Sequence, residues 1–136
     1  MANELSDHCN TIEESYEFML AYAGQGVAGD DSSGSPVRGF LGSAANAIAG
    51  LVSAYDLAIK QGGLEPKEKY KGFRAVLERD AQDSLALVEL VLAQPRISSL
   101  VIDNLNASVH LRALLTDLFL VDEVLKLQTV ATPVAP

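Results

Sequence analysis

The chain has 136 residues, a hydrophobic fraction of 49% with only 6% aromatic residues, and a net charge of −8 at neutral pH. This length suits one domain with a single core that needs no disulfide or structural metal. The acidic balance, with ten basic residues that we read as scattered, argues against binding to nucleic acid or to anionic membranes. We find no secretory leader and no apolar stretch long enough to span a bilayer, so we expect a cytoplasmic protein.

The pattern of the first segment predicts an amphipathic helix over residues 4–24, with apolar side chains on one arc and acidic side chains opposite. Cys9, the only cysteine, falls on the apolar arc, and we expect it to be buried as a small hydrophobe rather than paired with His8. Residues 24–35 follow as a flexible loop rich in Gly, Ser and Asp. Its acidic residues argue against phosphate binding and leave open a docking role toward a basic partner.

Three further helices are expected, each bounded by Pro or Gly. One runs over residues 36–60, and its flank of small residues predicts a close helix contact. The next runs from about residue 65 to a point before Pro95, and the last covers residues 97–128, followed by a loose tail at 129–136. We therefore predict an all-α fold, an up-and-down four-helix bundle whose single domain spans residues 1–128. The small-residue flank comprises Gly39, Ser43, Ala47, Gly50 and Ala54.

The last helix carries two apolar arcs when residues 97–127 are placed on one continuous wheel. The first arc suits the core of the bundle, whereas a surface helix of a monomer has no use for a second one. We therefore predict a homodimer, with two-fold symmetry, through the second arc. The alternative left open is that this helix is simply the central core helix. The first arc holds Ile97, Leu100, Val101, Leu111, Leu114, Leu115, Leu118, Phe119 and Leu125, and the predicted partner interface is Ile102, Val109, Ala113, Leu120 and Val124.

Four polar residues form an alternative site. Asp103, His110 and Asp117 stand seven residues apart, which places neighbouring members roughly 10 Å apart along a helix. We interpret them as a polar seam between the two apolar arcs. A general base or half of a metal site is the functional alternative. Asp80 falls on the inner side of the preceding helix, where it needs an Arg or Tyr partner or takes a raised pKa.

No nucleophile with a base at useful spacing and no cofactor motif is present, while apolar helix surface is in excess. We therefore expect a non-enzymatic protein without metal or cofactor that acts by protein–protein contact, as an adaptor, scaffold or assembly factor. A larger protein partner beside the second copy is compatible with this expectation. The rival hypothesis is a bundle that binds a small ligand or metal through interior Asp, His and Tyr residues.

Overall fold

The computed structural model describes residues 4–29 and 36–131, and every regular element within them is a helix. The prediction of an all-α fold is confirmed. The described residues form six helices rather than the four expected. They are α1 (Glu4–Ala23), α2 (Pro36–Ala49), α3 (Leu51–Gly62), α4 (Lys67–Leu92), α5 (Ser99–Ala107) and α6 (Val109–Ala131).

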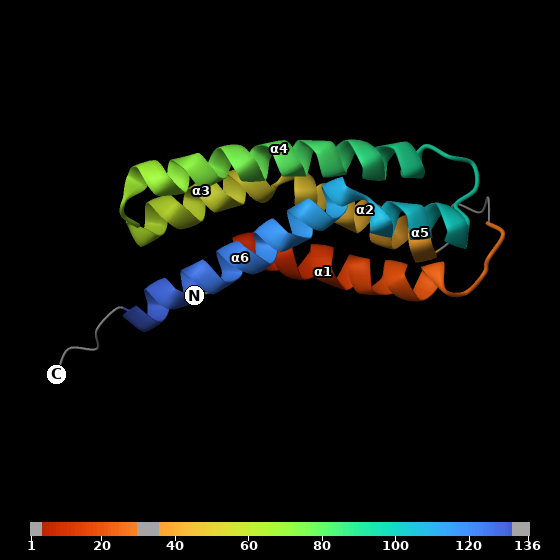
Figure 1. Cartoon of the computed structure of the whole chain (residues 1–136), viewed down its shortest axis with the longest axis horizontal. Helices are drawn as coiled ribbons and strands as arrows, with labels where there is room; N and C mark the ends of the chain where they lie inside the picture. Colours follow the sequence, from red (N-terminus) through yellow and green to blue (C-terminus); the bar gives the residue numbers. More distant parts are fainter. Residues whose placement is uncertain (1–3, 30–35, 132–136) are drawn as a thin grey trace.

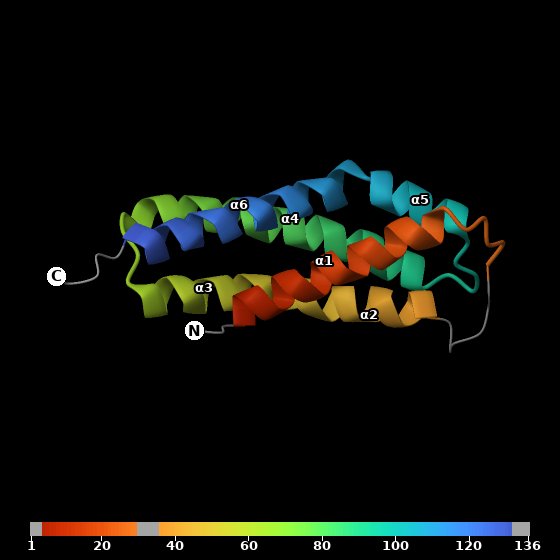
Figure 2. The same ribbon diagram turned by 90° about the horizontal axis from the view of Figure 1, so that it is seen from below.

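The helices run along the long axis of the molecule (Figure 1). α2 and α3 follow each other in one direction, and α5 and α6 likewise share a direction (Figure 2). α1 packs against α2, α3 and α5, and α4 packs against α2, α3 and α6. The turn between α3 and α4 lies at the same end of the molecule as the C-terminal end of α6 (Figures 1 and 2).

Two predicted helices are each interrupted at one residue, and this is where the expectation was wrong. Gly50 separates α2 from α3, and a Cβ built on it would lie 2.9 Å from Nε2 of His8 on α1. Glycine at this position therefore leaves room for the ring of His8. Ser108 separates α5 from α6 with an extended backbone (φ −60°, ψ 132°), and its Oγ accepts a hydrogen bond from the His110 amide at 3.2 Å. Ser108 thus acts as the N-cap of α6.

The close contact predicted for the second helix occurs along only part of its small-residue flank. Ala47 and Ala54 are buried on either side of Gly50. Gly39 and Ser43 are exposed, and a Cβ on Gly39 would meet nothing within 4 Å. The contact is therefore confined to the region around the α2–α3 junction.

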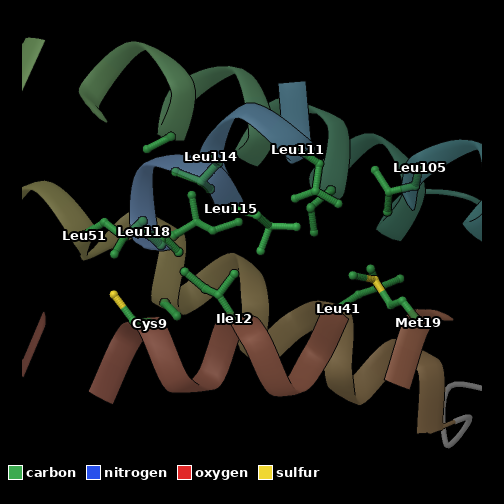
Figure 3. Close-up of a cluster of buried hydrophobic side chains, with 14 of the residues drawn as sticks. Cys9, Ile12, Met19, Leu41, Leu51, Leu105, Leu111, Leu114, Leu115 and Leu118 are labelled. Atoms are coloured by element: carbon green, nitrogen blue, oxygen red, sulfur yellow. The ribbon is translucent and has the colours of Figure 1, made fainter. Parts of the chain in front are cut away.

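The core is built from aliphatic side chains of all six helices. α6 supplies a row of leucines that faces α1 and α2, as Figure 3 shows for Leu114, Leu115 and Leu118 opposite Ile12 and Leu41. α4 contributes buried small and branched residues that let α2 and α6 approach it. Aliphatic burial of this kind is the main stabilising term of the fold. The buried residues of α4 are Leu77, Ala81, Ser84, Val88 and Val91.

The chain segments outside the predicted helices differ in part from expectation. Val27, inside the predicted 24–35 loop, is held by Ser99 through two hydrogen bonds of 2.9 Å, one from the Ser99 amide to its carbonyl and one from its own amide to Ser99 Oγ. Residues 30–35, with the acidic pair of that loop, lie outside the described residues. The predicted tail also begins later, because α6 continues to Ala131. Residues 132–136 of the tail lie outside the described residues.

Candidate functional site

The most unusual polar contact in the described chain is between two carboxyl groups, Asp80 of α4 and Asp117 of α6. Each lies at the edge of its helix's inner face, since Leu77 and Ser84 flank Asp80 within α4 and Leu118 follows Asp117 in α6, all three of them buried. Where α4 packs against α6, these edges meet and the two carboxyl side chains share a hydrogen bond.

This contact changes the protonation of the pair. Burial, the hydrogen bond with Asp80 and the negative charge of Asp80 together raise the pKa of Asp117 from 3.8 to about 7, and burial is the largest of the three causes. Oδ2 of Asp117 is buried and receives no hydrogen bond from a described donor. Two ionised carboxylates have no donor between them, so the contact requires one proton held by the pair. Asp117 is therefore the member of the pair that keeps its proton up to near-neutral pH.

His110 lies further along the same α4–α6 contact but is not part of the pair. Its Nδ1 is 3.8 Å from Oδ2 of Asp83, and both side chains are about half exposed. The backbone carbonyl of His110 accepts a hydrogen bond of 3.0 Å from Oγ of Ser84. These contacts join the start of α6 to the middle of α4, and an exposed side-chain contact of this length contributes little stability.

The structure brings together only some of the polar residues that the sequence singles out. Asp80 meets Asp117, which corrects the expectation of an Arg or Tyr partner. His110 meets Asp83, which was not considered, and Asp103 is exposed on α5. Among the described residues, no group of three or more His, Cys, Asp or Glu side chains is placed to hold a metal ion.

The predicted partner interface is divided by the interruption at Ser108. Ile102 is fully buried in the core, so its assignment to a partner surface was wrong. Val109 and Leu120 are 71% and 54% exposed, whereas Ala113 and Val124 are half-buried. A single continuous wheel places Ile102 and Val109 on one arc, and the break at Ser108 removes that relation.

Two residues of the predicted core arc are also on the surface. Leu100 is 70% exposed on α5, and Phe119 is 55% exposed on α6. The cause is again the change of helical phase at Ser108, together with a narrower inner face on α6 than the wheel suggests. The other members of that arc are buried or packed against the core, namely Ile97, Val101, Leu111, Leu114, Leu115, Leu118 and Leu125.

Two buried polar residues of α5 were missed as structural contacts. Nδ2 of Asn106 donates to the carbonyl of Met19 at 3.1 Å, and Oγ of Ser99 donates to the carbonyl of Tyr22 at 2.6 Å. Both carbonyls lie near the C-terminal end of α1, and the Tyr22 carbonyl also accepts a hydrogen bond from the Gln25 amide at 3.1 Å. The α5 side chains therefore close the C-terminal end of α1, and no sequence signal specifies that pairing.

A cavity of about 280 Å³ opens beside the exposed side of α6. Its walls are mostly apolar, with Phe73 and Tyr70 from α4 opposite Leu120 and Val124 from α6. Two residues of the predicted partner interface therefore border a hollow surface. Apolar surface of this kind is common where proteins bind ligands or other chains.

Comparison with protein-family models, curated proteins and solved structures finds no match to this chain. None of the helices in the described residues is long and apolar enough to cross a membrane.

Proposed function

We propose that the protein acts by protein–protein contact, as a non-enzymatic adaptor, scaffold or assembly factor, and that its first contact is with a second copy of itself. The surface involved is the side of α6 that points away from the core. We call it the α6 outer face. It consists of Val109, Ala113, Leu120, Val124 and Leu127.

The single observation that carries this proposal is the exposure of apolar side chains along one stripe of α6. Leu127 is 63% exposed, and with Val109 and Leu120 it recurs at helical spacing on the side opposite the buried leucines. The stripe extends over roughly 27 Å at 1.5 Å per residue. Isolated exposed leucines are ordinary, but several apolar side chains aligned on one side of a helix are a feature of interaction surfaces.

The charges beside the outer face favour an antiparallel two-fold pairing of α6 helices. Arg112 and Glu123 lie on the same flank of the face, near its opposite ends. In an antiparallel pair each flank meets itself, so Arg112 of one copy comes near Glu123 of the other, and the reverse contact occurs as well. Val109 then lies opposite Leu127. A parallel pair places unlike flanks together and makes neither ion pair.

We also propose that the six helices work as an up-and-down four-helix bundle, in which α2 with α3 and α5 with α6 each form one interrupted helix. Single residues, Gly50 and Ser108, separate the members of each pair. The proposed bundle holds α6 along one edge of the molecule, as seen in Figure 2. The location of the protein in the cytoplasm stays a prediction.

The test is the oligomeric state of the wild type and of two matched variants, measured by sedimentation equilibrium. We expect a dimer for the wild type and a monomer for Leu120→Asp, with the dimer weakened roughly a hundredfold or more because two buried charges replace central apolar contacts. Phe119→Asp is the control, since Phe119 is 55% exposed beside Leu120 but lies off the outer face. A monomeric wild type, or equal effects of the two variants, contradicts the proposal.

The antiparallel arrangement has its own test. Arg112→Glu should weaken the dimer, and adding Glu123→Arg should restore it because the ion pairs re-form with reversed sign. The circular dichroism spectrum reports whether each variant remains helical. If the double variant loses as much dimer affinity as the two single variants added together, the antiparallel register is refuted. The existence of the dimer is then still decided by Leu120→Asp.

A further inference from the structure

The positive charge of this acidic protein is concentrated at one end, around the turn between α3 and α4. Residues 60–74 contain five of the ten basic residues but only two of the eighteen acidic ones. The reading of the basic residues as scattered was therefore wrong. The remainder of the chain is more acidic than the net charge of −8 suggests, so this end is the region where an anion meets least repulsion.

A cavity of about 490 Å³ lies in this basic region, between α3 and α4. Its apolar lining comes from Ile59 and Leu64 and from the rings of Tyr55 and Tyr70. The Tyr55 hydroxyl donates to the carbonyl of Tyr70 at 2.7 Å, so this hydroxyl is already engaged and the ring contributes mainly carbon surface. The volume falls within the range of small-molecule sites, which are mostly apolar with a few charged or polar groups.

Three lysines line the same cavity: Lys60 at the end of α3, and Lys67 and Lys71 in the first turns of α4. No ion pair to an acidic side chain of the described chain is formed by any of them. The cavity's one acidic group, Asp56, is neutralised by Arg74, whose Nε lies 2.7 Å from Asp56 Oδ1. The cavity therefore combines an apolar lining with unpaired positive charge.

We propose that the α3–α4 cavity binds an organic anion with an apolar body. The carboxylate or phosphate of such a ligand contacts the three lysines, and its aryl or alkyl part packs on the tyrosine rings and Ile59. Lysine ammonium groups suit this role because they are mobile point charges that accept either headgroup. None of the residues that line this cavity belongs to the α6 outer face, so the lysine variants test it separately from the dimer, although Tyr55 and Tyr70 also line the smaller cavity beside Leu120.

The test uses two fluorescent probes with the same aromatic body and different charge, 8-anilinonaphthalene-1-sulfonate and neutral N-phenyl-1-naphthylamine. We expect the wild type to bind the sulfonate about tenfold more tightly than the neutral probe, and added salt to reduce this preference. The variant Lys67→Gln/Lys71→Gln should lose most of the preference. The control Arg79→Gln/Lys126→Gln removes the same charge from residues outside the cavity and should keep it.

Displacement experiments then test the ligand class. Octanoate and octyl phosphate should each displace the bound sulfonate from the wild type, and the stronger competitor identifies the preferred headgroup. The proposal is overturned if the sulfonate does not bind saturably, if both double variants bind it equally, or if neither competitor displaces it.

Discussion

The Asp80–Asp117 pair gives the protein a pH dependence that one substitution should remove. In the folded chain, burial and Asp80 raise the pKa of Asp117 to about 7, whereas the unfolded chain releases this proton near 3.8. Folding therefore takes up a proton between these values. The stabilisation of the folded chain by this proton uptake is fully present below about pH 4 and is lost as the pH rises through about 7. Asp117→Asn keeps a hydrogen-bond donor toward Asp80 without the titrating group.

The size of the effect follows from the rise in pKa and from the exposure of the pair. The rise covers roughly three pH units, each worth about 1.4 kcal/mol, which sets an upper limit near 4 kcal/mol. Asp117 is only half-buried, so solvent screening reduces the expected effect to about 1–2 kcal/mol. We therefore expect the stability of Asp117→Asn, relative to wild type, to increase by about that amount between pH 4.5 and pH 8.

Urea unfolding followed by circular dichroism measures this difference across the pH range. Asp103→Asn is the matched control, because Asp103 is exposed on α5 and takes part in none of the ion pairs of the described chain. The free energy of unfolding of the control should vary with pH as that of the wild type does. The comparison with this control therefore corrects for the loss of one negative charge. If the stability of Asp117→Asn differs from that of the wild type by the same amount at every pH, the raised pKa of Asp117 is refuted.

Three other contacts give separate tests. Gly50→Ala should destabilise the protein by about 1 kcal/mol in thermal unfolding, because its Cβ would lie 2.9 Å from His8 Nε2. His8→Ala in the same background should recover that loss, and a stabilising Gly50→Ala would contradict the contact. Ser99→Ala should cost about 2 kcal/mol in urea unfolding, since the Val27 amide loses its Oγ acceptor and the Tyr22 carbonyl keeps the Gln25 amide but loses the Ser99 hydroxyl, and a neutral result would show that water replaces Oγ. Cys9 should react with a thiol reagent only as the protein unfolds, because burial raises its pKa to about 12, and rapid labelling of the folded protein would argue against that burial.

The uninterrupted helices were predictable from the sequence. α1 and α4 each carry one amphipathic pattern, and the flanking Gly or Pro residues limit both helices to within a few residues of the observed ends. Gly50 did appear in the small-residue flank of the second helix. A single glycine inside a periodic pattern, however, does not distinguish a helix that continues from one that breaks, because glycine is found both inside helices and at their ends.

The residues of the candidate site were predictable from the sequence, but the contact between them was not. Asp80 and Asp117 were both recognised as polar residues on otherwise apolar faces, which is a property of each helix alone. Their pairing depends on how far α4 slides along α6, and side-chain packing between the helices sets that register. Electrostatics favoured an Arg partner for Asp80, yet the structure places a second carboxyl there, and the raised pKa of Asp117 reduces the repulsion between the two groups.

The break at Ser108 shows how burial overrides local helix preference. A continuous helix would gain one or two backbone hydrogen bonds, each worth about 1 kcal/mol. The Ser108 cap on the His110 amide recovers part of that loss. The break also lets α5 bury Ile102 and Leu105 while α6 buries its leucines, and each aliphatic side chain is worth about 1.5–3 kcal/mol. Burial therefore outweighs continuity, and the α6 outer face begins at Val109 without Ile102.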